Sequence, residues 1–116
     1  MTTVIYGIKN CDTVKKALRW LDDAGVDYRF HDFRVDGLEK AKVEAWVESE
    51  GWESVINRRS TSWKALSQER RDTLDDASAV IAVLETPTLV KRPVMEHGDT
   101  LSFGFKADHY KTLLGA

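Results

Sequence analysis

The fold of this chain is decided by residues 4–25, VIYGIKNCDTVKKALRWLDDAG. The stretch opens with a β-prone apolar run, VIY, which a glycine ends, and such a run is typical of a buried strand. The apolar residues that follow recur at helical spacing: Val14, Ala17, Leu18 and Leu21. Gly25 comes directly after this pattern and is expected to stop the helix. The stretch therefore predicts a strand followed by an amphipathic helix, and we expect Asp12 or Thr13 to cap the helix.

A second strand is expected over residues 26–33, where aromatic residues alternate with polar ones. Strand, helix and strand within about 30 residues have the length of a βαβ unit. The first two strands should therefore lie parallel to each other.

Helices are expected in the middle of the chain. Residues 36–39, DGLE, have the form of a capping box and open a helix that Gly51 ends, with one apolar stripe: Val43, Trp46 and Val47. Residues 52–68 are polar and predict short helices or turns. A further stripe predicts a helix that stops near Pro87: Leu74, Ala77, Ile81 and Leu84.

The C-terminal part predicts a hairpin and a last helix. A strand is expected after Pro93, a turn at residues 97–99, a partner strand over 101–105 and a helix over 107–114 that Gly115 ends. The order βαβ, helices, ββα describes an α/β fold with a mixed sheet, whose last pair of strands is antiparallel. We expect a single domain over residues 1–116.

The composition excludes several classes of protein. With 42% apolar and 31% charged residues and a net charge of −2, the chain reads as a globular domain without a footprint for nucleic acid or an anionic membrane. No apolar run approaches the roughly 18 residues of a membrane span, and no signal peptide is recognisable. The single cysteine allows no internal disulfide, which fits a cytoplasmic location. The histidines lack metal-ligand spacing, so we expect no metal. We also expect no bound cofactor, and nothing in the sequence demands more than a monomer.

Cys11 lies between the first strand and the first helix, and this position has chemical consequences. The first turn of a helix presents unpaired N–H groups and the positive end of the helix dipole, which favour a thiolate over a thiol. Lys9, Lys15 and Lys16 add positive charge, which Asp12 partly offsets. A buried structural cysteine is the alternative, and position alone does not separate the two.

A redox cycle within one chain is excluded, because Val14 stands where a C-x-x-C motif would have its second cysteine. Any disulfide of Cys11 must therefore join another molecule, either a small thiol such as glutathione or a thiol protein.

Five stretches of the chain, in order, resemble the ArsC/Spx/YffB family of thioredoxin-fold proteins. They are YGIKNCDTVKKA at 6–17, GVDY at 25–28, HDFR with DGL at 31–38, NRRST at 57–61 and KRPV at 91–94. The chain looks most like the YffB-like branch, which has no second cysteine. The resemblance implies a thioredoxin-like core with a helical insertion from about residue 38 to 84.

The resemblance also implies roles for single residues. Cys11 matches the family's catalytic cysteine, and the bond before Pro93 matches the cis-proline that thioredoxin folds place beside that cysteine. Two arginines match its oxyanion-binding positions: Arg58, or Arg59 in a shifted alignment, and Arg92. Asn10 is a candidate for orienting the loop around the cysteine, although a plain turn role is equally open.

The chain departs from the arsenate reductases of this family at two positions. Lys106 falls near the family's third anion-binding arginine, and a lysine cannot grip an oxyanion in a bidentate manner. Gly7 replaces a histidine that precedes the cysteine in those enzymes. Both departures argue against arsenate as the natural substrate.

The expected function is a glutathione-dependent monothiol oxidoreductase, with glutathione as co-substrate and glutaredoxin as a possible further partner. Cys11 would attack a disulfide, and Arg92, Arg58 and Lys106 would hold the anionic groups of the substrate. Two alternatives remain open: an arsenate reductase that uses glutathione and glutaredoxin, and a regulator that binds RNA polymerase, as Spx-like proteins do.

Overall fold

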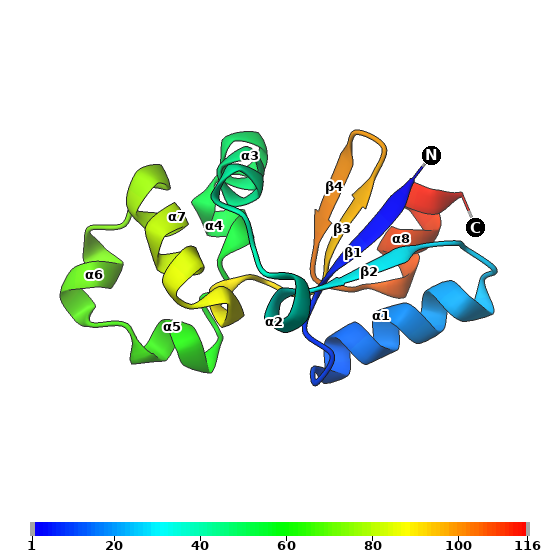
Figure 1. Cartoon of the computed structure of the whole chain (residues 1–116), viewed down its shortest axis with the longest axis horizontal. Coiled ribbons are helices and arrows are strands. Elements are labelled where there is room, and N and C mark those ends of the chain that lie inside the picture. Colours follow the sequence, from blue (N-terminus) through cyan, green and yellow to red (C-terminus); the bar gives the residue numbers. More distant parts are fainter. Residues whose placement is uncertain (1, 116) are drawn as a thin grey trace. The chain divides into compact units, whose positions relative to one another are not determined.

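The computed structural model describes residues 2–115, which form two compact units (Figure 1). The sheet unit contains the chain up to Gly37 and from Arg92 onward. The helical unit contains Leu38–Lys91, and the insertion expected over about residues 38–84 falls within it. No helix among the described residues is both long enough and apolar enough to cross a membrane.

Four strands form the sheet in the order β2-β1-β3-β4: β1 (Thr3–Gly7), β2 (Arg29–Asp32), β3 (Val94–His97) and β4 (Thr100–Phe103). The β1 and β2 strands are parallel, with Gly7 opposite Asp32. The other two pairs are antiparallel, with Tyr6 of β1 opposite Val94 of β3, and Val94 opposite Phe103 of β4. The predicted mixed sheet, with a parallel first pair and an antiparallel last pair, is confirmed.

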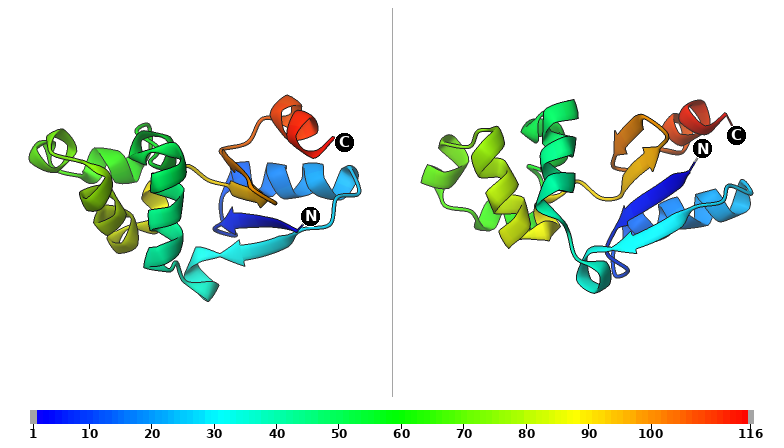
Figure 2. Two further views of the ribbon diagram at one scale, coloured as in Figure 1. Left: turned by 90° about the horizontal axis from the view of Figure 1, so that it is seen from above. Right: turned by 45° about the horizontal axis from the view of Figure 1, so that its top comes forward.

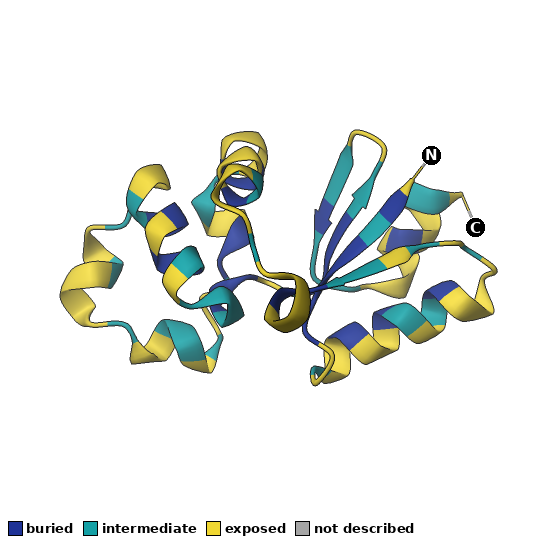
Figure 3. Ribbon diagram, viewed as in Figure 1, coloured by how far each residue is buried: buried dark blue, intermediate teal, exposed yellow. Residues whose placement is uncertain are grey.

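The sheet unit has a hydrophobic core that α1 (Asp12–Asp23) and α8 (Ala107–Leu114) share with the central strands. Its fully buried members are Ile5, Ala17, Leu21, Met95 and Tyr110. Ile5 of β1 and Met95 of β3 are opposite each other, so their side chains point to the same face of the sheet, and both helices pack there. The predicted apolar stripe of α1 is confirmed at Val14, Ala17 and Leu21, and its buried positions are marked in Figure 3.

The predicted caps of α1, Asp12 and Thr13, are wrong by one and two residues. Cys11, in extended conformation, is the N-cap, and its carbonyl accepts the first helical hydrogen bond from the Lys15 N–H at 2.9 Å. Neither Asp12 nor Thr13 can cap, because both already lie in the first turn. The candidate nucleophile is thus itself the residue at which the helix begins.

The second strand is shorter than predicted. It begins at Arg29 and ends at Asp32, whose carboxylate accepts a hydrogen bond from the Arg34 N–H at 2.8 Å. This side-chain cap starts a one-turn helix, α2 (Phe33–Asp36), where the alternating pattern suggested continued strand.

Helices make up most of the helical unit: α3 (Lys40–Glu50), α4 (Trp52–Val55), α5 (Thr61–Ala65), α6 (Gln68–Asp72), α7 (Asp76–Glu85) and the 3-10 turn η1 (Pro87–Leu89). The short helices predicted over residues 52–68 are confirmed. The packing of α3 against α7 forms the centre of this unit, and the two helices lie side by side in both views of Figure 2. A bridge between Ile56 and Val90 joins the chain after α4 to the chain after η1.

Two predictions for the helical unit are wrong. The DGLE pattern is not a capping box, because Asp36 belongs to α2 and Glu39 is the N-cap of α3 without a side-chain bond. The buried face of α7 consists of Ala79, Val80, Ala82 and Val83. Ala77 and Ile81, which the spacing places in the core, are exposed.

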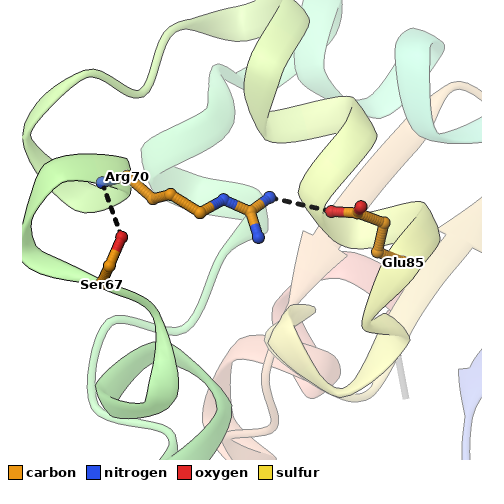
Figure 4. Close-up of polar contacts among 3 residues, drawn as sticks. All are labelled: Ser67, Arg70 and Glu85. Atoms are coloured by element: carbon orange, nitrogen blue, oxygen red, sulfur yellow. Dashed lines mark hydrogen bonds and ion pairs between the residues drawn. The ribbon is translucent and has the colours of Figure 1, made fainter.

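The true capping box of this unit begins α7. The Asp75 carboxylate accepts from the Ser78 N–H at 2.8 Å, and the Ser78 hydroxyl accepts from the Asp75 N–H at 2.9 Å. The start of α6 is capped by Ser67, and Arg70 then reaches Glu85 of α7 at 2.8 Å (Figure 4). Both partners of that ion pair are exposed, so it adds little stability. The side-chain caps, in contrast, define where α6 and α7 begin.

Candidate active site

Cys11 lies where the chain leaves β1 and enters α1, four residues beyond Gly7. Cys11 is half-buried, and its side chain makes no capping hydrogen bond. The N–H groups of the first helical turn are therefore left without a side-chain acceptor on this N-cap. A cysteine in this position lies beside the positive end of a helix of 12 residues, which favours a negatively charged sulfur.

Ile8 and Gly7 position the loop that carries the cysteine. Ile8 is buried, which anchors the loop at the sheet, whereas Lys9 and Asn10 are exposed. A Cβ atom added at Gly7 would lie 2.8 Å from Cγ2 of Val14, so the first turn of α1 packs directly onto this glycine. Any side chain at position 7 would therefore have to displace Val14.

Arg92 and Pro93 lie at the same edge of the sheet as Cys11. They directly precede Val94, which is paired with Tyr6, the residue before the end of β1. The Arg92–Pro93 peptide bond is cis, which confirms that prediction. Because Tyr6 and Val94 are paired, the loop after β1 and the entry to β3 are neighbours in the sheet unit, where Pro93 is buried and Arg92 is half-buried.

The chain also leaves β4 at this edge, three residues before Lys106. Phe103 at the end of β4 is opposite Val94, and the Gly104 N–H donates to the Pro93 carbonyl at 2.9 Å. Lys106 follows as the exposed N-cap of α8. Topology thus brings Cys11, Arg92, Pro93 and Lys106 to one edge of the sheet.

Arg58 belongs to the helical unit. It lies in the turn after Ile56 and forms an exposed ion pair of 3.8 Å with Glu53. The neighbouring Arg59 N–H donates to the Asn57 side chain at 3.0 Å, which fixes the turn that presents both arginines. The anion-binding role of Arg58 stays a prediction.

One basic residue at the sheet edge was missed from the sequence. Arg34 lies in α2, directly after β2, whose last residue is paired with Gly7 of β1. The signal was present in Asp32, a strong N-cap residue at the end of the expected strand. Interpreting Asp32 as an N-cap would have ended the predicted strand at this residue. Arg34 would then have been recognised as a further basic residue at this edge of the sheet.

The chemistry available at this edge is that of one thiol and several cations. Among residues 2–115 no group of three or more histidine, cysteine, aspartate or glutamate side chains could hold a metal ion. A nucleophilic sulfur beside backbone N–H groups and basic side chains can attack an electrophilic sulfur or oxyanion and hold a negatively charged partner.

Comparison with known proteins gives a consistent assignment. Residues 6–113 match the ArsC family. An uncharacterized protein of Haemophilus influenzae is 41% identical over 107 residues, which cover 92% of this chain and 94% of that protein. The global transcriptional regulator Spx of Lactiplantibacillus plantarum is 26% identical, over 96% of this chain and 85% of its own length.

The fold is shared with solved structures. The YFFB protein superposes with a TM-score of 0.91 at 41% identity, covering 96% of this chain and 97% of its own. Glutaredoxin from Archaeoglobus fulgidus shares the fold alone, with a TM-score of 0.53 at 20% identity over 98% of this chain and 86% of its own. The sheet unit is therefore thioredoxin-like, and with its family match over nearly the whole length the chain belongs to the ArsC family.

Proposed function

We propose that this protein is a glutathione-dependent monothiol oxidoreductase in which Cys11 is the nucleophile. The observation that carries the proposal is the position of Cys11, which is half-buried rather than enclosed in the core and is the N-cap of α1 without a side-chain hydrogen bond at that cap. Membership of the ArsC family supports thiol-based chemistry in general.

The proposed reaction needs one cysteine and two glutathionyl groups, one carried by the substrate disulfide and one supplied as free glutathione. The Cys11 thiolate attacks the glutathionyl sulfur of a mixed disulfide, R–S–SG, and the R–S⁻ group leaves and takes up a proton. A second glutathione thiolate then attacks the glutathionyl sulfur on Cys11, which restores the Cys11 thiolate and releases oxidised glutathione. Summed over both steps, R–S–SG and one glutathione thiol become R–SH and oxidised glutathione, so the R sulfur is reduced while the free glutathione thiol is oxidised.

The basic residues of the sheet edge are proposed to hold the carboxylates of glutathione. Arg92 is half-buried beside Pro93, and Lys106 is exposed at the start of α8. Charge-assisted hydrogen bonds from such groups are stronger than neutral ones, and they orient the attacked sulfur toward Cys11. Two carboxylate groups on glutathione match more than one cation at the site.

Turnover of a glutathionylated peptide tests this proposal, with reduced glutathione, NADPH and glutathione reductase supplied. We expect Cys11→Ser to abolish NADPH consumption above the uncatalysed rate. Arg92→Gln should raise KM by about tenfold, the effect of losing one charge-assisted hydrogen bond. Arg29→Gln is the matched control, because Arg29 is an exposed arginine of the same unit at the opposite end of β2.

Retention of turnover in Cys11→Ser would refute the proposal. A second arm replaces the peptide by arsenate and adds glutaredoxin. Faster turnover of arsenate than of the peptide would contradict the proposed substrate and favour arsenate reduction, which the crowding of Gly7 by Val14 and the lysine at position 106 argue against.

A further inference from the structure

Helix α7 is apolar on two sides, and the core uses only one of them. Its buried face contains Ala79 and Val83, whereas Ala77 and Ile81 are exposed and lie one turn apart on the other side. Ile81 is 55% exposed, and it is one of two large hydrophobic residues with this degree of exposure among residues 2–115. A single exposed side chain of this kind needs no explanation by itself, so its significance depends on what lies next to it.

A groove lies directly beside this stripe, between α3 and α7. Its volume is about 250 Å³, and apolar side chains form its floor: Val47, Ala77 and Val80. Ile81 does not line the groove itself, but it is exposed and lies one turn beyond Ala77, so it continues the same side of α7. We call the floor together with Ile81 the α3–α7 groove.

The rim of the α3–α7 groove is acidic. Glu44 and Glu48 of α3 and Asp76 of α7 line it, and the two glutamates are exposed one turn apart on the same helix face. Like charges at this spacing destabilise a helix, and the basic neighbour on this face of α3 is Lys40, one turn before Glu44. Within residues 2–115 the side chains of these three acids have no hydrogen bond or ion pair of their own.

We propose that the α3–α7 groove binds a cationic amphipathic helix of a partner protein. The apolar floor and Ile81 would receive an aliphatic side chain, and two lysine or arginine side chains one turn apart would face Glu44 and Glu48. The charges are complementary, because the partner is basic and the rim is acidic. The spacing also fits, because Glu44 and Glu48 are one helical turn apart, as two basic residues on one face of the partner helix would be. This surface contains none of the residues of the thiol chemistry, so Cys11→Ser should bind the same helix with unchanged affinity.

A synthetic peptide tests the proposal directly. The probe is a fluorescent 14-residue helix with leucines at positions i, i+3, i+4 and i+7 and lysines on both flanks, and its twin carries glutamates in place of the lysines. We expect the lysine peptide to bind in a saturable manner, to shift amide NMR signals of α3 and α7, and to bind less tightly as salt rises. The glutamate twin should not bind.

Variants of the chain locate the binding surface. Ile81→Ser and the pair Glu44→Gln/Glu48→Gln should each weaken peptide binding about tenfold or more, as expected for an anchor and for its flanking charges. Val35→Ser is the matched control for the apolar change, because Val35 is 80% exposed in α2. Glu50→Gln/Glu69→Gln removes the same charge from exposed positions that do not line the groove.

The proposal is overturned if both peptides bind equally, or if the control variants weaken binding as much as the groove variants. It is also overturned if ultracentrifugation shows a dimer that Ile81→Ser dissociates, since a second copy would then be the occupant. Every substituted residue of the helical unit is exposed, so all these variants should fold, which circular dichroism checks.

Discussion

At the scale of single residues, Gly7 is defined by its contact with the first turn of α1. A Cβ atom at this position would lie 2.8 Å from a methyl group of Val14, which is fully buried. We expect Gly7→Ala to destabilise the protein by about 1–3 kcal/mol, the usual cost of overpacking. Urea denaturation followed by tryptophan fluorescence measures this free energy of unfolding.

A double mutant separates this clash from a general loss of stability. Val14→Ala removes the methyl groups that an alanine side chain at position 7 would meet, so Gly7→Ala should cost less in that background than in the wild type. If the two costs simply add, the contact between position 7 and Val14 does not determine the choice of glycine.

Tyr110 is the second informative residue, because its ring is buried and its hydroxyl group lacks a hydrogen-bond partner in the described chain. The ring packs edge-on against Phe105 and Trp20, with centroids 4.8 and 5.8 Å away. Tyr110→Phe keeps these contacts and removes the unsatisfied hydroxyl, so we expect the free energy of unfolding to rise by about 1 kcal/mol. Urea denaturation at neutral pH measures the change, and a loss of stability would show that the hydroxyl is satisfied.

The same residue predicts an alkaline effect. Burial raises the pKa of Tyr110 above its ordinary value of 10.0. Above that pH the unfolded chain loses the phenolic proton while the folded chain keeps it, so stability that is complete below this value falls as the pH rises. Tyr110→Phe should lose less stability than the wild type between about pH 9 and 11, and an identical loss would contradict the buried, neutral phenol.

At the scale of elements, the start of α7 depends on the capping box of Asp75. The hydrogen bond from the Ser78 N–H, followed by that from its hydroxyl, lowers the pKa of Asp75. A lowered pKa means that the carboxylate stabilises the fold above the pKa of the unfolded chain, and that this contribution disappears as the pH falls through the folded value. Asp75→Asn keeps an acceptor without a charge, so its stability relative to wild type should improve on acidification.

The control for this prediction is Asp76→Asn, which removes a charge from the next position and leaves the cap in place. Asp75→Ala should be less stable than Asp75→Asn at neutral pH, because it loses the acceptor altogether. Thermal unfolding from pH 3 to 7 measures all three, and an effect of Asp76→Asn equal to that of Asp75→Asn would contradict the assignment of the cap.

The elements also show where sequence periodicity succeeds and where it fails. The stripe of α1 was predicted correctly, because that helix is apolar on one side and charged on the other. In α7 both sides are apolar, so spacing alone could not distinguish the core face from the face with Ile81. The end of β2 was missed because the alternation of apolar and polar residues continues past Asp32. The strand ends there because the Asp32 carboxylate accepts a hydrogen bond from the Arg34 N–H, and alternation does not report such a bond.

At the scale of the whole molecule, those residues of the candidate site could be predicted whose positions follow from the order of strands and helices along the chain. A strand that passes into a helix at Cys11, and a strand that begins after Pro93, belong to one edge once the sheet order is known. Arg34 was not found, because its position depends on the exact end of β2. Arg58 was proposed only because the chain resembles the family. It belongs to the helical unit, whose packing cannot be predicted from local sequence patterns.

The proposed chemistry requires that the folded chain activate the sulfur of Cys11 at the start of α1. This activation is measured as the rate of mixed-disulfide formation with oxidised glutathione at neutral pH, followed by intact-protein mass for the native protein and for the same protein in urea. We predict one glutathionyl group that Cys11→Ser abolishes, that reduced glutathione removes, and that forms about tenfold faster in the native protein, a difference of ~1–2 kcal/mol. An equal or slower rate in the native protein would show that the fold does not activate this thiol.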